Sequence, residues 1–330
     1  MPPVTGRNHQ RRSLTEWAMQ AWSTESGLKE TVPRYLQTWH SNRLQEKISK
    51  GRASMEACQL CPRECGNNRY LEKGKICRLG HRAKVSSYGP HFGEEACLSG
   101  WKGSGTIFFS SCNLRCVFCQ NGDISHRETG CEVNAEELAA IMLDLQQRGC
   151  HNINLVTPSH VVVPVLEALE VAIPQGLHLP LVYNTSAYDS VEALELLDGI
   201  VDIYMPDFKF WTPASSRRYL KARDYPAIAR RNLKLMYKQV GRLRVNSRGI
   251  AYRGVLLRHL VMPGHPTETE SILHFLSQEV DPEMAVNVMF QYHPAHRVSA
   301  RTYPEIHRPV TREERRQALR IARRLGLTIL

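Results

Sequence analysis

The sequence predicts a mixed α/β protein built on a parallel β-sheet, which is either an incomplete barrel or an open doubly wound sheet. From residue 106 onward, short apolar runs alternate with segments of helical periodicity, which is typical of strands joined by helices. With 330 residues, of which 42% are hydrophobic and 23% charged, the chain can form one large barrel or two modest domains. The predicted strands are residues 106–109, 153–156, 181–184, 201–205, 255–261 and 286–290.

Four segments follow one another along the chain. Residues 1–57 favour a polar helical arm, because apolar side chains recur near helical spacing after Pro33. Residues 58–104 contain a cysteine cluster and a connector rich in Gly and Ser, in which we expect irregular structure. Residues 105–300 carry the sheet, and residues 301–330 end in a basic helix. The sequence therefore predicts one α/β body with an extension at each end.

Two helices are predicted from both their apolar periodicity and their capping signals. The segment "NAEELAAIMLDLQQRG" begins with the capping pair Asn134 and Glu137 and ends at Gly149. The segment "TREERRQALRIARRLGL" begins with Thr311 and Glu314. Arginines on this second helix form a solvated face or contact phosphates. They are Arg312, Arg315, Arg316, Arg320, Arg323 and Arg324.

The charge and the hydropathy pattern narrow the class of protein. The net charge of +11 indicates either a basic solvated surface or affinity for an acidic partner, nucleic acid or an anionic small molecule. No window approaches the ~18 uncharged apolar residues of a membrane helix, so no membrane partner is expected. The basic N-terminus lacks the apolar core of a secretory signal, although it leaves a weak organelle-targeting signal open. We therefore expect a cytoplasmic protein.

Three cysteines follow the first predicted strand in the stretch "FFSSCNLRCVFCQN". Cys112, Cys116 and Cys119 bring three thiolates to the carboxyl end of that strand, where parallel α/β folds place their chemistry. Thiolates suit zinc or an iron–sulfur cluster. Three protein ligands leave one coordination position open, as in catalytic rather than structural metal sites.

This CxxxCxxC spacing, with Phe118 before its last cysteine, resembles the signature of radical S-adenosylmethionine (radical SAM) enzymes. The resemblance implies a partial (βα)6 barrel and a [4Fe–4S] cluster held by Cys112, Cys116 and Cys119, which would be the catalytic centre. In that family the open iron binds the amino and carboxylate groups of SAM. Reductive cleavage then releases a 5′-deoxyadenosyl radical that abstracts hydrogen from the substrate.

Further segments are similar to the activating enzymes of pyruvate formate-lyase, over about residues 105–300. They are "CQN", "YNTSAYDSVEALELLDGIVDIYMPDFKF", "LLRHLVMPG" and "FQYHPA". The Gly-Gly-Glu segment that binds the SAM amino group in those enzymes is replaced by "NLVTPSH", so Thr157, Ser159 or backbone carbonyls beside Pro158 would take that role. By resemblance, the other SAM-binding residues are Phe118, Gln120, Asn121, Asn184, Asp207, Lys209, Arg258 and His293.

Several of these residues also have purely structural interpretations. Asp207 and Lys209 at a strand end are equally compatible with a local ion pair, and His293 with a hydrogen-bonded residue at the rim. Gly103 and Gly105 are expected in the turn before the first predicted strand, because no Gly-Lys-Ser/Thr follows them to form a phosphate loop.

A second cysteine group, in "CQLCPRECGNNRYLEKGKIC", lies upstream of the predicted sheet. Cys58, Cys61, Cys65 and Cys77 could satisfy a tetrahedral zinc ion or a closed iron–sulfur cluster, and the alternative is a reduced cysteine-rich knob. With most cysteines in two tight clusters and no secretion signal, metal binding is favoured over disulfides. The single cysteines at 97, 131 and 150 are expected to act mostly as small hydrophobes. Cys131 has one alternative role, as the fourth ligand of a closed zinc site.

Three functions remain open from the sequence. The first is a radical SAM enzyme of the poorly characterised activating-enzyme branch with an N-terminal four-cysteine motif. Its substrate would be a protein such as a glycyl-radical enzyme, and its electron donor a flavodoxin or ferredoxin. The second is radical SAM chemistry on RNA or a small metabolite, suggested by the basic charge. The third is a non-catalytic zinc-binding scaffold. The substrate and the oligomeric state stay undetermined.

Overall fold

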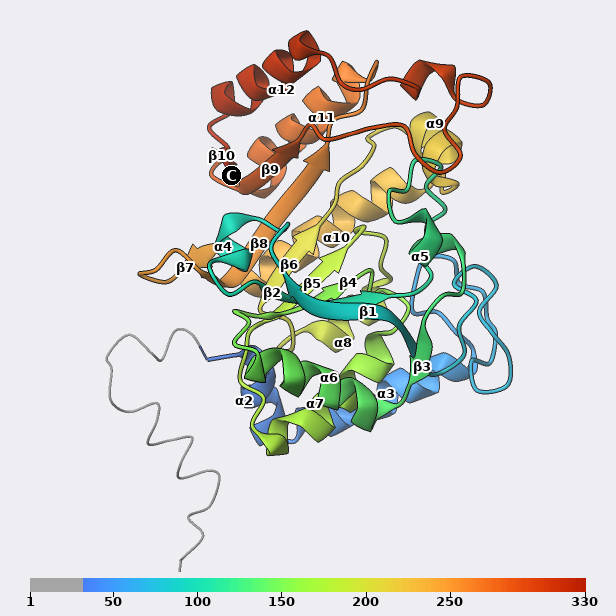
Figure 1. Ribbon diagram of the computed structural model, residues 1–330, viewed down its shortest axis with the longest axis vertical. Coiled ribbons are helices and arrows are strands. Elements are labelled where there is room, and N and C mark those ends of the chain that lie inside the picture. Colours follow the sequence, from blue (N-terminus) through green and yellow to red (C-terminus); the bar gives the residue numbers. More distant parts are fainter. Residues whose placement is uncertain (1–31) are drawn as a thin grey trace, which may run out of the picture. The chain divides into compact units, whose positions relative to one another are not determined.

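The computed structural model describes residues 32–330. Residues 1–31, which include the basic N-terminus and the first half of the predicted arm, lie outside the described part of the chain. Within the described residues the strands join into one sheet, drawn in Figure 1. The strands are β1 (Ala83–His91), β2 (Ser104–Phe109), β3 (Cys131–Val133), β4 (Ile153–Val156), β5 (Leu181–Thr185), β6 (Ile203–Pro206), β7 (Arg244–Val245), β8 (Ala251–Leu260), β9 (Ala285–Met289) and β10 (Thr328–Ile329).

The order of the strands in space identifies the fold. The path runs β10-β9-β8-β6-β5-β4-β2-β1-β3, with β7 paired to β8. Along this path every neighbouring pair from β2 to β10 is parallel, whereas β1 is antiparallel to both β2 and β3, and β7, off the path, is antiparallel to β8. The six predicted strands thus follow sequence order without the reversal of a doubly wound sheet. This confirms the predicted α/β class and identifies the sheet as a partial (βα)6 barrel that stays open between β3 and β10.

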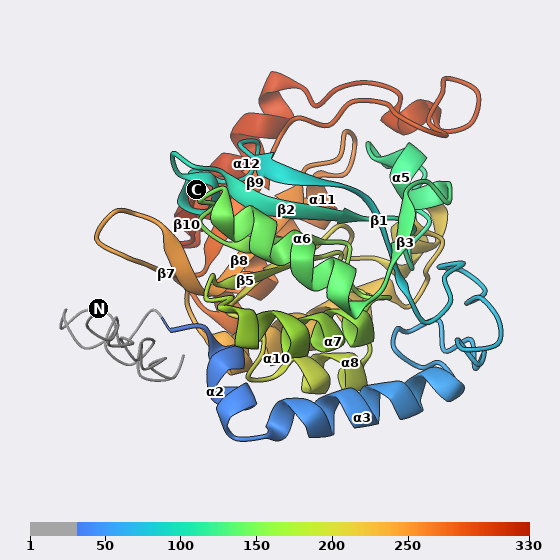
Figure 2. The same cartoon turned by 60° about the horizontal axis from the view of Figure 1, so that its bottom comes forward.

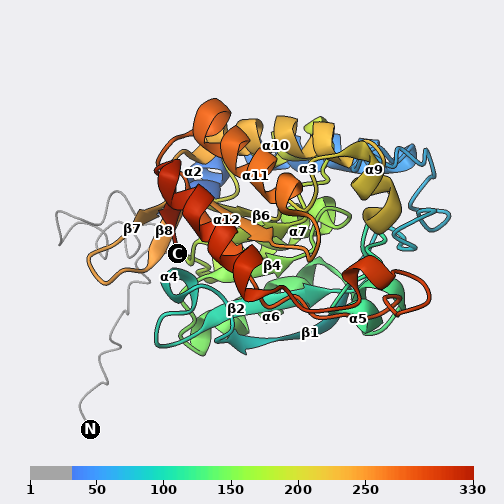
Figure 3. The ribbon, with the colours of Figure 1, turned by 90° about the horizontal axis from the view of Figure 1, so that it is seen from above.

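Helices cover the outside of this sheet. In Figure 2, α3 runs along the outer surface of α7 and α8, and Figure 3 shows α12 beside α11. The helices are α2 (Arg34–His40), α3 (Arg43–Glu56), α4 (Ala96–Ser99), α5 (Gly122–His126), α6 (Ala135–Gln147), α7 (Val162–Ala172), α8 (Val191–Leu197), α9 (Pro213–Ser215), α10 (Tyr225–Val240), α11 (Pro266–Phe275) and α12 (Arg312–Arg324). No helix in the described chain is long and apolar enough to span a bilayer.

Both predicted capping pairs are present. At the start of α6, the Glu137 amide donates to Asn134 Oδ1 and the Asn134 amide donates to Glu137 Oε2, each over 2.8 Å. Thr311 and Glu314 form the same reciprocal box at the start of α12. These contacts satisfy amide groups that have no partner within the first turn of a helix.

The connector before the first predicted strand is not irregular, and that prediction was wrong. Residues 83–91 form β1, which pairs with β2 from Val85 to His91 and is followed by the short helix α4. The strand was not predicted because it contains Gly89 and Pro90, and both residue types are unfavourable in strands. Antiparallel pairing with β2 outweighs that local preference.

Gly105 was also misplaced by sequence, because it lies inside β2 rather than in a turn. A Cβ atom on Gly105 would lie 2.5 Å from the Asn152 carbonyl oxygen, so glycine permits the close approach of β2 and the chain entering β4. Gly103 does adopt a turn conformation, with a φ of 86°.

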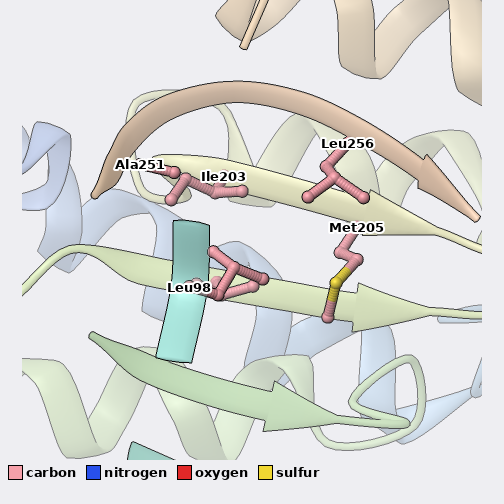
Figure 4. Packing of buried hydrophobic residues seen from close by; sticks show 6 residues of the cluster. Leu98, Ile203, Met205, Ala251 and Leu256 are labelled. Carbon is pink, nitrogen blue, oxygen red and sulfur yellow. The ribbon is translucent and has the colours of Figure 1, made fainter. Parts of the chain in front are cut away.

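An apolar cluster packs along strands β5, β6 and β8 (Figure 4). Leu98 from α4 packs there against side chains from β5, β6 and β8, and the clustered residues are all completely buried. Its members are Leu98, Val182, Ile203, Met205, Ala251 and Leu256.

Candidate active site at the carboxyl ends of the strands

The cysteine loop is anchored to its surroundings on both sides. Directly after β2, the Ser110 amide donates to the Lys84 carbonyl oxygen over 2.8 Å, which ties the loop to β1. Ser111 has a φ of 71°, a left-handed conformation that turns the chain sharply before Cys112. Further along, the Val117 amide donates to the Tyr219 carbonyl oxygen over 2.9 Å. The loop is therefore held at the strand edge by main-chain contacts.

The three loop thiols open onto one cavity of about 280 Å³. Its opposite wall is formed by the carboxyl ends of β4, β5, β6, β8 and β9. That volume lies at the lower end of the ~300–1,000 Å³ typical of ligand sites. Predicted site residues among its lining are Cys112, Cys116, Phe118, Cys119, Gln120, Asn121, Thr157, Asn184, Asp207, Lys209 and Arg258.

Two predicted residues do not line the cavity. Ser159 is buried, and its hydroxyl lies 3.2 Å from the hydroxyl of Thr185. His293 is exposed, and its Nδ1 lies 3.4 Å from Nε2 of Gln120, which does line the cavity. The other predicted residues thus share the cavity wall, whereas Ser159 lies in the core and His293 lies at the rim.

Arg258 on β8 joins the polar side chains of this wall. Its guanidinium donates to Asp207 Oδ1 over 2.9 Å, to Asn184 Oδ1 over 2.7 Å and to Glu94 Oε2 over 3.2 Å. Lys209 donates to the other Asp207 oxygen over 2.7 Å. The local ion pair between Asp207 and Lys209 is therefore real, and it is one part of a larger network that faces the cavity.

The network favours the charged forms of Asp207 and Arg258 although both side chains are mostly buried. Burial alone would raise the pKa of Asp207, but the charges of Arg258 and Lys209 outweigh it and lower that pKa below its usual value. Burial opposes the charge of Arg258 as well, yet Asp207 and Glu94 raise its pKa. For Glu94 burial prevails, and its pKa is raised. Close opposite charges thus stabilise ionised Asp207 beside the cavity.

Sequence reasoning missed Glu94. This residue follows β1, its side chain is 8% exposed, and its Oε1 also accepts from the side-chain Nδ2 of Asn154 over 3.1 Å. The available signal was the pair of adjacent acids in "HFGEE", in a segment expected to be irregular. Because β1 was not predicted, nothing indicated that this segment turns back into the sheet.

Ser125 was missed for a different reason. Its hydroxyl lies 3.4 Å from the Cys119 sulfur, and it belongs to the short helix α5, which no apolar periodicity marks in the sequence.

The loop supplies a donor set that suits an iron–sulfur cluster. Burial raises the pKa of the Cys112 thiol to about 11 and raises that of Cys116 further, so a cation is needed to hold them as thiolates at neutral pH. Three soft donors with no fourth cysteine in the cavity wall leave a coordination position open. Among residues 32–330, no three His, Cys, Asp or Glu side chains are gathered tightly enough to hold a metal ion. The assignment of an iron–sulfur cluster to this loop therefore rests on two facts: the three donors are thiols, and all three line the same cavity.

The upstream cysteines lie in a separate segment of turns. Cys58, Cys61 and Cys77 are buried, and Cys65 is partly exposed. Burial raises the pKa of the Cys61 thiol to about 12, and part of this rise comes from the other three cysteines, which therefore lie within electrostatic range of Cys61. Arg69 fixes this segment to the barrel, because its Nη1 donates to the His160 carbonyl oxygen over 3.0 Å.

The single cysteines occupy three different environments. Cys150 is buried and Cys97 packs against the apolar cluster, as expected for small hydrophobes. Cys131 is exposed on β3 and does not belong to the cavity wall.

Comparisons with known proteins give a sequence relative and several solved structures that match part of the chain. No protein-family model matches the sequence. The uncharacterized protein MJ0674 of Methanocaldococcus jannaschii is 34% identical over 302 residues, which cover 88% of this chain and 81% of that protein.

Solved structures with similar folds share little sequence with this chain. Streptococcus suis SuiB bound to S-adenosylmethionine matches with a TM-score of 0.44 and 11% identity over 68% of this chain and 51% of SuiB. TYW1 with a lysine-pyruvate adduct bound has a TM-score of 0.40 and 12% identity over 67% of this chain and 72% of TYW1. The cobalamin-dependent S-adenosylmethionine radical enzyme OxsB has a TM-score of 0.37 and 13% identity over 63% of this chain and 30% of OxsB. The chain spans about half the length of SuiB.

Proposed function

The chain belongs to the family of the uncharacterized protein MJ0674 of Methanocaldococcus jannaschii, and from the geometry of its site we propose that it is a radical SAM enzyme. One observation carries the proposal. A CxxxCxxC loop directly after β2 opens onto a cavity whose other wall is the carboxyl ends of the remaining parallel strands. In parallel barrels this edge is where catalytic residues gather.

Each wall has a distinct role in this proposal. Cys112, Cys116 and Cys119 would hold a [4Fe–4S] cluster, which when bound supplies the electron that splits SAM into methionine and a 5′-deoxyadenosyl radical. Phe118 packs edge-on against Phe210 and Tyr292, with ring centres 6.0 and 6.1 Å away, and would form the apolar side of the adenine site.

The polar wall would orient the rest of SAM. Because Asn184 Oδ1 accepts from Arg258, the amide nitrogen of Asn184 remains as a donor for a ligand. Asp207 and Lys209 present opposite charges at the same edge, which suits the amino and carboxylate groups of the methionine part. Thr157 lines the cavity whereas Ser159 bonds inside the core, so we assign Thr157 to the amino group in place of the missing Gly-Gly-Glu. Gln120 and Asn121 complete the wall beside the loop, and His293 would approach through Gln120.

The finer assignments extend this proposal. We favour an activating-enzyme-like reaction that abstracts hydrogen from a protein partner, with a flavodoxin or ferredoxin as electron donor and a cytoplasmic location. Chemistry on RNA or a small metabolite is the second candidate, favoured by a basic groove beside the loop. The cysteines at 58, 61, 65 and 77 would hold zinc or a second iron–sulfur cluster, since Cys58, Cys65 and Cys77 lie within electrostatic range of Cys61.

A reconstitution experiment tests the central proposal. The full-length protein, loaded anaerobically with iron and sulfide, should show an EPR signal after dithionite reduction that changes when SAM is added, and it should release 5′-deoxyadenosine. The triple variant Cys112→Ala, Cys116→Ala, Cys119→Ala should lose both properties. Cys131→Ala, which removes an exposed thiol outside the cavity, should keep them. Two zinc ions per chain with no iron would instead identify the zinc scaffold.

A further inference from the structure

A basic groove of about 710 Å³ lies beside the cysteine loop, between residues 214–221 and residues 297–303. The loop joins it directly, because the Arg297 amide donates to the Val117 carbonyl oxygen and the Val117 amide donates to the Tyr219 carbonyl oxygen, both over 2.9 Å. The residue after Val117 lines the candidate active site. The groove and that site are therefore neighbours across one short stretch of chain. The side chains of the groove used below are Arg217, Arg218, Lys221, Arg297 and Tyr303.

Positive charge in this groove is mostly uncompensated. Four of its lining residues are cations, and one carboxylate, Glu305, pairs with Arg218 over 2.7 Å. That contact lowers the pKa of Glu305 to about 2, so the pair stays ionised. No carboxylate of residues 32–330 forms an ion pair with Arg217, Lys221 or Arg297. Close like charges repel, and an anionic ligand relieves this repulsion.

Two of the four cations, Arg218 and Lys221, are held in place before any ligand arrives. Lys221 has a φ of 59°, and its carbonyl oxygen accepts from Arg63 over 3.0 Å, while Arg63 also donates to the Asn113 carbonyl oxygen over 2.9 Å. A left-handed conformation is unfavourable at a residue other than glycine and persists where surrounding contacts enforce it. The Lys221 ammonium donates to the Tyr303 hydroxyl over 3.1 Å, and Arg218 lies 5.3 Å from the centre of the Tyr303 ring. The groove therefore combines two fixed cations with two arginines, Arg217 and Arg297, whose side chains have no ion-pair partner among residues 32–330.

We propose that this basic groove binds the phosphate groups of a ligand. Guanidinium groups bind phosphate through paired, charge-assisted hydrogen bonds, and Arg217 and Arg297 are free to form them. The volume of the groove lies within the range of ligand sites. The phosphates belong to a free phosphorylated molecule or to the backbone of a single-stranded RNA, which share this chemistry. A role of the groove in anchoring the substrate rests on the proposed radical SAM function. Phosphate binding by the groove does not depend on that function.

Binding measurements on the full-length protein without SAM test this inference. Calorimetry with inorganic pyrophosphate and fluorescence anisotropy with a labelled single-stranded RNA of about 12 nucleotides, a length that spans one typical single-strand site, distinguish the two sources. The double variant Arg217→Gln, Arg297→Gln should weaken the bound probe at least tenfold. It should also lower, by about 1.4, the magnitude of the slope of log K against log salt concentration for RNA, because two phosphate contacts are lost. The control Arg312→Gln, Arg323→Gln removes two exposed arginines of α12 that have no ion-pair partner among residues 32–330, and it should change affinity less than twofold.

Each outcome decides the proposal. Pyrophosphate binding without RNA binding indicates a free phosphorylated ligand, and RNA binding that pyrophosphate does not displace indicates a phosphodiester backbone. Either outcome supports the proposal when the Arg217→Gln, Arg297→Gln variant loses that binding. Equal loss in both double variants, or no binding of either probe by the unaltered protein, overturns it. Arg217→Lys, Arg297→Lys keeps the charge, so intermediate binding would support paired guanidinium contacts. Because SAM cleavage is assayed separately, failure here leaves the proposed function intact, and the reverse also holds.

Discussion

At the scale of single residues, Arg258 supports the candidate site through three acceptors that come from different parts of the chain. Asp207 follows β6, Asn184 belongs to β5, and Glu94 lies between β1 and α4. The Arg258 side chain is 16% exposed and those of Asp207 and Glu94 are 18% and 8% exposed, so the charges are largely shielded from water. Removing the shared cation leaves two buried carboxylates without their main partner.

Arg258→Leu should therefore lower the free energy of unfolding by about 3–5 kcal/mol, the usual cost of breaking one side of a buried ion pair. Urea unfolding followed by circular dichroism measures this change. Arg312→Leu, at an exposed position of α12, is the matched control and should change the free energy by less than about 0.5 kcal/mol. Similar losses in both variants would show that Arg258 does not hold the network together.

His259 makes stability depend on pH. Burial lowers its pKa from 6.5 to about 4, with a partial opposing effect from the Phe208 carbonyl oxygen. On acidification from pH 6.5 to 4 the unfolded chain takes up the proton first, so the free energy of unfolding falls as pH decreases through that window. Between about pH 7 and pH 5 the expected contribution of this residue is about 2 kcal/mol. His259→Gln should reduce the measured fall by that amount in urea titrations at both pH values, whereas His307→Gln at an exposed position should not.

At the scale of elements, two glycines in neighbouring strands give opposite expectations. Gly105→Ala places a Cβ atom 2.5 Å from the Asn152 carbonyl oxygen and should lower the free energy of unfolding by about 1–3 kcal/mol, because β2 must move away. Gly89→Ala in β1 meets nothing within 4 Å and should change it by less than about 1 kcal/mol. Thermal and urea unfolding of both variants compare them. Equal effects would mean that close packing of β2 is unimportant.

The elements also show what the sequence can predict. The six predicted strands β2, β4, β5, β6, β8 and β9 have apolar runs because both faces of a parallel sheet are covered, and α6 and α12 carry side-chain capping pairs. These signals are local, so they were found. β1 depends on pairing with β2, and α4 is stabilised by burying Leu98 in the apolar cluster. Such contacts involve distant partners, and no window of sequence contains them.

The same distinction applies to the candidate site. Cysteine spacing and strand-end polar residues indicated most of the cavity wall, because parallel strands bring their carboxyl ends to one edge. Glu94 could not be found this way, since it enters from outside the series of parallel strands. Ser159 follows β4 in sequence but faces the core instead of the cavity, which depends on a single turn of the chain.

At the scale of the whole molecule, the upstream cysteine segment and the barrel should respond differently to metal removal. Residues 57–82 consist mostly of turns, whereas the barrel has its own strands and core, so a metal bound by the four cysteines would be needed for order only in that segment. After oxidative treatment with a chelator, trypsin should cleave at Lys73 and Lys75 at least tenfold faster, with the barrel strands still protected. Mass spectrometry identifies the cuts. An unchanged cleavage rate would contradict metal binding there.

The shared contacts of Arg258 restrict which substitutions this family can tolerate one at a time. Because one guanidinium serves Asp207, Asn184 and Glu94, the effects of substitutions at these positions cannot add. Once Arg258 is replaced, Glu94→Gln should restore stability, although the same change is harmful in the intact network. Double-mutant cycles would record this reversal as sign epistasis. Single replacements would then pass through unstable intermediates, so these four residues should be inherited or exchanged as a block.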